Sequence, residues 1–280
     1  MISRIRRALG HDLWSTLMDD AEAVGLRASG GDPAIVTAAD VDALPAPVAR
    51  YMRFMGVIGR PRDWSFQAKV TGRFRMRPGQ RFMPFEAWQY NTRFPVARLF
   101  HMRIDFAGFV PMIGRDSYVG GHGRMRGKLL GLVPVADSSG RELDVSELVT
   151  WLNDSILLSP SMLLDDATSW SAAGDDAFDV SFTDGGTTVT ARVLIDERGA
   201  PSNFSTRDRY AALPGGLLRA EWTTPITQWK FRGGQPLPGP GSAIWHLPEG
   251  PFTYVEGGVV PATVVYNVRP EPGTVERVAS

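Results

Sequence analysis

The spacing of hydrophobic residues is helical near the start of the chain. Residues 13–26 and 44–57 both carry apolar side chains three or four positions apart, as on one face of a helix. Pro45 and Pro47 stand where the first turn of the second segment would begin, which is a typical place for proline. We therefore expect residues 1–60 to form a helical segment that packs on the remainder of the fold.

The hydrophobic period changes to two after residue 60. In residues 64–77, apolar side chains such as Phe66 and Val70 alternate with polar ones such as Gln67 and Lys69, which predicts a long strand with one face in water. Similar segments follow, separated by glycine and proline, and we expect about eleven strands in all. The short glycine turns between them favour hairpins and hence antiparallel pairing.

Helical spacing returns once, in the middle of the chain. Asp144, with Glu147 three residues later, has the pattern of a helix cap, and Trp151 follows on the apolar side. We expect a helical insertion at about residues 144–166, inside a single β domain that covers residues 61–280.

The number of strands limits the fold. A sheet of this size must curl or close to bury one face and to protect its edges. The sequence therefore predicts a mainly β (α+β) fold. Its large curved antiparallel sheet forms a half or nearly closed barrel, with N-terminal helices and a central helical lid. A barrel of this kind encloses a pocket.

Residues 115–135, RDSYVGGHGRMRGKLLGLVPV, are rich in glycine and raise the question of a phosphate-binding loop. Such a loop needs a helix directly after the glycines, because the helix N-terminus faces the phosphate. The residues after Gly123 include no capping residue and end in β-branched side chains, which is typical of a strand. We expect two strands joined by a glycine turn, with the glycines serving backbone shape.

Several motifs in a fixed order give a resemblance to a known family. They are LPAPVARYMRFMGV, GRFRMRPGQRFMPFEAWQY, the glycine-rich stretch, ELVTWLNDSILLSPSMLL and a late YNV. Over roughly residues 44–268 the chain resembles a family of uncharacterised bacterial proteins, a domain of unknown function, whose members often carry Glu at the position of Asp154. In architecture it is similar to lipoprotein-carrier half-barrels that hold acyl chains. The resemblance implies a half-barrel fold and brings no established reaction.

Composition and charge exclude several classes of partner. Thirty basic and thirty acidic residues give a formal net charge of zero, so we expect no nucleic-acid partner. The chain has no cysteine, which excludes disulfides and cysteine-ligated metals. The N-terminus lacks the apolar stretch of about 7–15 residues found in signal peptides, and no apolar run reaches the about 20 residues that cross a bilayer. The expected location is the cytoplasm.

The start of the chain combines basic and apolar residues. Arg4, Arg6 and Arg7 cluster there, and apolar residues recur at near-helical spacing, at Ile2, Ile5, Leu9, Leu13, Leu17 and Val24. This pattern is found in helices on anionic membranes and also in ordinary packed helices. A peripheral membrane contact through the N-terminal helix is therefore among the expected partners.

Four side chains are candidates for acid–base catalysis. Glu86 lies in an aromatic segment, Asp116 in GRDSYV, and Asp154 on the central helix. A carboxyl group among apolar side chains has its neutral form favoured, which raises its pKa toward a range useful in catalysis. His122, in the glycine turn near Asp116, is the fourth candidate. A structural ion pair with an arginine is the alternative for each acid.

Metal and cofactor chemistry have little support in the sequence. The four histidines stand singly on different segments, without the paired spacing of a metal site. We expect no metal and no cofactor.

Aromatic and methionine side chains are spread over many predicted strands. Eight tryptophans and ten methionines would suit an apolar cavity, and ordinary core packing is the alternative. The candidate ligand-binding residues are Met83, Phe85, Trp88, Tyr118, Trp151, Trp222 and Arg207.

Three functions are compatible with these observations. The first is binding of a hydrophobic small molecule or acyl chain in the cavity of the curved sheet. The second is a cofactor-free enzyme, an isomerase, cyclase or hydrolase, that acts on an apolar substrate through the carboxyl groups named above. The third, a protein-interaction module, requires an exposed apolar patch in place of a pocket.

Overall fold

The chain folds around one large antiparallel sheet. The structure is a computed structural model that describes residues 12–26, 33–106, 110–213 and 216–269. In this part of the chain, fourteen strands form a single sheet in the order β6-β5-β4-β3-β2-β1-β17-β16-β13-β10-β9-β8-β7, with β18 beside β1. Its strands are β1 (Ser65–Phe74), β2 (Met83–Thr92), β3 (Ala97–Phe106), β4 (Val110–Val119), β5 (His122–Leu129), β6 (Val133–Ser139), β7 (Thr168–Ala172), β8 (Ala177–Asp184), β9 (Thr187–Ile195), β10 (Pro201–Thr206), β13 (Glu221–Pro225), β16 (Gly241–Leu247), β17 (Gly250–Val259) and β18 (Val265–Tyr266). Two hairpins form separate two-stranded sheets: β11 (Tyr210–Leu213) with β12 (Gly216–Arg219), and β14 (Trp229–Arg232) with β15 (Gln235–Pro238).

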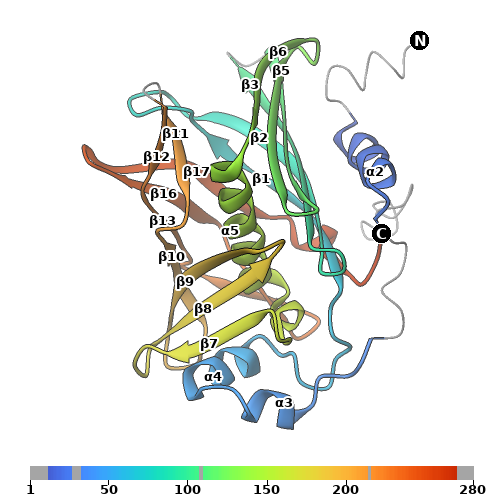
Figure 1. The fold of residues 1–280 in the computed structure, drawn as a ribbon, viewed down its shortest axis with the longest axis vertical. Coiled ribbons are helices and arrows are strands. Elements are labelled where there is room, and N and C mark those ends of the chain that lie inside the picture. The colour runs from blue at the N-terminus through green and yellow to red at the C-terminus, as the bar shows by residue number, and fades with distance from the viewer. Residues whose placement is uncertain (1–11, 27–32, 107–109, 214–215, 270–280) are drawn as a thin grey trace.

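The central helix explains why the sheet curls. Helix α5 (Arg141–Leu158) and the 3-10 helix η1 (Pro160–Leu163) connect β6 to β7, which are the two edges of the sheet. The helix therefore runs through the concave side, with the sheet curved around it (Figure 1). A mainly β fold with a curved antiparallel half-barrel is what the sequence predicts, and the structure confirms it.

Helix α5 belongs to the core of the protein. Trp151 is fully buried, stacks on Phe182 with 4.6 Å between ring centroids, and donates its indole hydrogen bond to the Thr92 carbonyl at 3.0 Å. Leu148, Leu152 and Ile156 are fully buried as well. Burial of this kind stabilises by about 1.5–3 kcal/mol for each large apolar side chain. The helix packs inside the concavity, so the predicted lid is an interior element.

The N-terminal helices pack on two different parts of the sheet. Helix α2 (Leu13–Ala23) lies on the convex face and buries Leu13 and Leu17 against β2 and β3. Helices α3 (Ala38–Asp42) and α4 (Ala46–Phe54) lie at the end of the barrel that contains β7 and β8 (Figure 1). There, the Tyr51 hydroxyl donates to the Ile156 carbonyl at 2.7 Å.

The structure bears on the expected membrane contact only in part. Most of the basic and apolar pattern, residues 1–11, lies outside the described residues. Leu13 and Leu17 belong to the same pattern and are buried against the sheet. Within the described residues, no helix is both long and apolar enough to cross a bilayer.

The glycine-rich stretch forms two turns and three strands. Gly120 and Gly121, with φ of 61° and 85°, make the turn from β4 into β5, so strand follows the glycines as predicted. A second turn at Leu130 and Gly131, with φ of 54° and 66°, separates β5 from β6. The prediction of one continuous strand beyond Gly123 is therefore wrong, because residues 130–131 adopt a left-handed backbone.

The start of α5 also differs from the prediction. The helix begins at Arg141, three residues before the predicted cap. Asp144 lies in its first turn, and its Oδ1 accepts a hydrogen bond from the Gly123 N–H at 2.7 Å. A Cβ on Gly123 would stand 2.3 Å from the Leu143 carbonyl oxygen, so only glycine allows this close contact between β5 and the helix.

Candidate functional site

A cavity of about 250 Å³ lies between α5 and the concave face of the sheet. It falls just below the about 300–1,000 Å³ usual for ligand pockets, so it suits a small molecule. One part of its wall is apolar, from Val70, Phe74, Phe85, Phe100, Met102, Trp222 and Val255. Another part is polar, from Gln89, Arg98, Asp116, Glu147, Asn153, Asp154 and Arg209.

Strand alternation decides which side chains reach the cavity. On β2, Phe85 and Gln89 point inward, while Trp88 between them points outward to α2. The register pairs Phe100 with Gln89 on one side and with Asp116 on the other, so three inward positions form one row across β2, β3 and β4. The next row, which contains Met102, is apolar. The wall therefore changes from polar to apolar along the strands.

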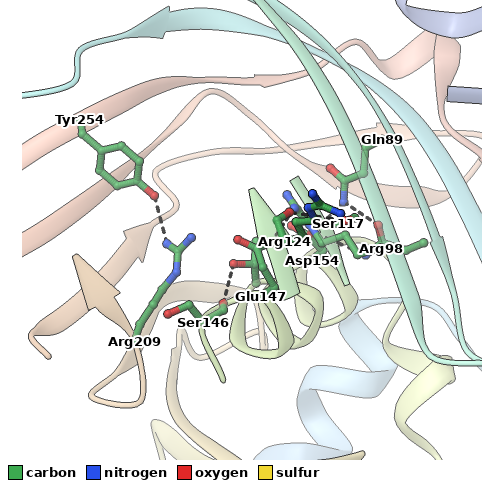
Figure 2. A network of polar contacts seen from close by, with 11 residues as sticks. Gln89, Arg98, Ser117, Arg124, Ser146, Glu147, Asp154, Arg209 and Tyr254 are labelled. Atoms are coloured by element: carbon green, nitrogen blue, oxygen red, sulfur yellow. Dashed lines mark hydrogen bonds and ion pairs between the residues drawn. The ribbon is translucent and has the colours of Figure 1, made fainter. Parts of the chain in front are cut away.

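Arg98 is the centre of the polar part (Figure 2). Its side chain is only 6% exposed, and its Nε donates to Asp154 Oδ2 at 2.7 Å. Its Nη1 donates to Glu147 Oε2 at 3.1 Å. The guanidinium also lies over the Phe100 ring, 4.8 Å from the centroid. Such hydrogen-bonded ion pairs tolerate burial because each charge has partners.

Asp154 is held in a fixed position from both elements. Its Oδ2 accepts hydrogen bonds from Gln89 Nε2 at 2.7 Å and Asn91 Nδ2 at 3.4 Å, besides that from Arg98. Burial raises the pKa of this carboxyl group, while Arg98 and Asn91 oppose the rise. These donors stabilise the charged form of Asp154 and hold its carboxyl group against Arg98.

Asp116 and Glu147 form a second pair of acids on the cavity wall. Burial, and then the Asp116 carboxylate, raise the pKa of Glu147 to about 7, against the effect of Arg98 and Arg209. Burial also raises the pKa of Asp116, again against Arg98 and Arg209. Among the described residues, none donates a hydrogen bond to the Asp116 carboxyl group, which faces the cavity. Because two negative charges close together in a buried site repel each other, ionisation of one acid disfavours ionisation of the other.

The structure places four of the predicted residues at the cavity. Asp116 and Asp154 belong to its polar part, and Phe85 and Trp222 to its apolar part. Because Asp116 lies on β4 and Asp154 on α5, the curvature of the sheet around the helix brings them together.

Glu86 and His122 lie away from the cavity. Glu86 is on the outward face of β2, where its carboxylate lies 2.8 Å from Lys69 Nζ and is 40% exposed. The His122 side chain is 84% exposed, with Nδ1 3.7 Å from Asp144 Oδ2. Because side chains alternate along a strand, Glu86 faces away from the inward residues beside it. The glycine turn holds His122 at the surface.

Five predicted ligand-binding residues serve other roles. Trp88 packs on the convex face with α2, and Trp151 is in the core. Tyr118 is buried and donates to Asp184 Oδ2 at 2.7 Å. Met83 packs with Phe85 and Ile104 beyond the cavity wall. Arg207 is 82% exposed and pairs with Glu221 at 3.2 Å.

Sequence reasoning missed Gln89, Arg98, Glu147, Arg209 and Tyr254. One signal was available: Glu147 and Asp154 are seven residues apart, which is two helical turns and therefore one face. Arg98 and Arg209 gave no such signal, because arginines are usually exposed.

Metal binding has no structural support in the described part of the chain. No group of three histidine, aspartate or glutamate side chains there is close enough to hold an ion. The carboxyl groups of the site are instead bonded to Arg98 or directed at the cavity.

The fold and the site define a β half-barrel with a cavity between α5 and the sheet that is polar at one side. The chain belongs to the family of unknown function DUF6544, which it matches over residues 34–257, and this confirms the predicted family. Comparison with curated proteins gives no match.

Two solved structures are similar to this one. The first is a domain described as an outer membrane lipoprotein-sorting protein from Vibrio parahaemolyticus, with 10% identity, a TM-score of 0.40, and coverage of 77% of this chain and 91% of that one. The second is a DUF1329 family protein from Desulfovibrio piger, with 12% identity, a TM-score of 0.37, and coverage of 86% and 97%.

Proposed function

We propose that the protein binds a small hydrophobic or lipid-like molecule in the cavity between α5 and the sheet. The observation that carries this proposal is the mixed wall of the cavity. Val70, Phe85 and Met102 give it an apolar side, and the Arg98 cluster gives it a fixed polar side. Binding sites of this type bury the apolar part of a ligand and orient it with a few polar groups.

A substitution that fills the cavity tests the proposal. Met102 lines the apolar wall, whereas Met76 is 43% exposed and lies outside it. We expect Met102→Trp to weaken binding of N-phenyl-1-naphthylamine by about tenfold or more, because the indole occupies the ligand's space. The measurement is a fluorescence titration of the purified protein after solvent extraction.

Met76→Trp is the matched control, and its affinity should equal that of the wild type. Equal affinities in all three proteins would show that the probe binds elsewhere and would contradict the proposal.

A second candidate, a cofactor-free enzyme, rests on the pair Asp116 and Glu147. Glu147 has a pKa of about 7, and Asp116 faces the cavity without a hydrogen-bond donor among the described residues. Two carboxyl groups with raised pKa values beside an apolar cavity are suited to moving a proton on a bound substrate. We propose isomerisation or another proton transfer at carbon as the reaction class.

Deuterium incorporation tests this candidate. The protein, with the small molecules that co-purify with it, is incubated in D₂O, and mass spectrometry follows deuterium at carbon. We expect Asp116→Asn to lower the rate by about 10²-fold, because one proton carrier is lost. Asp137→Asn is the control, since Asp137 pairs with Arg124 at the surface. Absence of incorporation by the wild type would remove the enzyme candidate and leave ligand binding untouched.

A further inference from the structure

Arg209 differs from Arg98 in forming no ion pair with an acid of the described residues. It lies between β10 and β11 and lines the cavity. Arg98 binds both Glu147 and Asp154, whereas no acidic side chain in the described part of the chain forms an ion pair with Arg209. Its Nε is buried without a hydrogen-bond partner. A buried guanidinium nitrogen without an acceptor is unfavourable, so a ligand atom that accepts its hydrogen bond would stabilise the site.

Aromatic side chains fix the position of this guanidinium. It lies over the Trp222 ring, 4.1 Å from the centroid, and 5.3 Å from that of Trp245. Its Nη1 donates to the Tyr254 hydroxyl at 3.0 Å (Figure 2). Stacking of this kind holds the plane of the guanidinium, so little freedom is lost when a ligand binds.

Tyr254 offers a further donor beside Arg209. Its oxygen already accepts hydrogen bonds from Arg209 Nη1 at 3.0 Å and Trp222 Nε1 at 3.2 Å. The hydroxyl proton must therefore point elsewhere, and none of the described residues accepts it. Because Tyr254 also lines the cavity, Tyr254 and Arg209 belong to one wall.

We propose that Arg209 and Tyr254 bind the carboxylate of an amphiphilic ligand whose hydrocarbon part lies against Phe85, Phe100 and Met102. The proposal rests on the proposed function and adds the chemical class of the ligand. A carboxylate fits because its two oxygens match the parallel donors of a guanidinium edge.

The charges around Arg209 are compatible with a bound anion. Asp154 is bonded to Arg98, so its charge is matched. Asp116 and Glu147 are the remaining acids near Arg209, and burial raises the pKa of both. A bound carboxylate would further favour their protonated, neutral forms. The ligand anion therefore adds to a site in which Arg209 forms no ion pair with an acid of the described residues.

Paired ligands that differ only in the head group test the inference. Decanoate and 1-decanol are titrated by calorimetry into the full-length protein after solvent extraction. We expect the wild type to bind decanoate about tenfold or more tightly than decanol, the range of charge-assisted hydrogen bonds. In Arg209→Gln this ratio should fall to about one, and Tyr254→Phe should reduce it, because one donor is lost. Arg207→Gln, two residues away and exposed, should keep the wild-type ratio.

The outcomes separate this inference from the proposed function. Equal affinities of the wild type for decanoate and decanol, or an unchanged ratio in both Arg209→Gln and Tyr254→Phe, would overturn the carboxylate site and leave apolar binding intact. Failure of the wild type to bind either compound would overturn both proposals. Thermal melting followed by circular dichroism confirms that each variant is folded.

Discussion

Replacing Arg98 with methionine is expected to lower the free energy of unfolding by about 3–5 kcal/mol at pH 8. The reason is the burial of its two partners, since the Glu147 and Asp154 side chains are 5% and 15% exposed. Without the guanidinium, their negative charges would lack the cation that makes burial tolerable. Urea unfolding of the wild type and Arg98→Met measures the difference. It should shrink at pH 5, where the carboxyl groups can bind protons.

Arg124→Met is the matched control for this prediction. Arg124 bonds Asp137 at 2.8 Å, with the two side chains 51% and 55% exposed, so its loss should cost about 0–1 kcal/mol. Combining Arg98→Met with Glu147→Gln and Asp154→Asn should recover part of the stability, because the unmatched charges are removed together. Similar losses for Arg98→Met and Arg124→Met would show that the network does not depend on Arg98.

Local patterns were sufficient to predict the architecture. Alternation in residues 64–77 gave β1, and the helical spacing around Trp151 gave α5. The need to bury one face of so large a sheet gave its curvature. The two elements follow from the spacing of residues close in sequence, and the curvature follows from the need to bury one face of the sheet.

The site depended on information that the sequence does not hold locally. Asp116 and Asp154 were identified as acids in apolar surroundings, but Arg98, which joins β3 to α5, was not. Its burial follows from the crossing of α5 through the barrel, which places Glu147 and Asp154 above β3. The alternation of side chains that predicts β2 also predicts that Glu86 and Phe85 face opposite sides of the sheet. It does not say which side is inward, because that depends on the whole sheet.

The second large effect concerns the protonation of Glu147. Burial, followed by the neighbouring Asp116, raises the pKa of Glu147 from 4.5 to about 7 in the folded protein. In this range the folded state binds the proton more tightly than the unfolded state does. The contribution of Glu147 to the free energy of unfolding is therefore greatest below pH 4.5. It falls by about 3 kcal/mol as the pH rises toward 7. Burial lowers the pKa of His101, which acts in the opposite direction over part of the same range.

Comparing Glu147→Gln with the wild type removes the effect of His101, which is common to both proteins, and reports the titration of Glu147 together with its neighbour Asp116. The amide is neutral at every pH and keeps an oxygen that can accept the hydrogen bond from Arg98 Nη1. We expect the free energy of unfolding of the variant, relative to wild type, to rise by about 2.5 kcal/mol between pH 5 and pH 8. Chemical denaturation at each pH measures this difference.

Glu142→Gln, on the exposed first turn of the same helix, should parallel the wild type. Parallel curves for Glu147→Gln and the wild type would mean that Glu147 is charged in the folded protein near neutral pH. In that case Glu147 would be anionic beside the cavity, and its charge would disfavour a carboxylate near Arg209. The pH dependence of stability and the head-group preference of the cavity therefore report on the same proton.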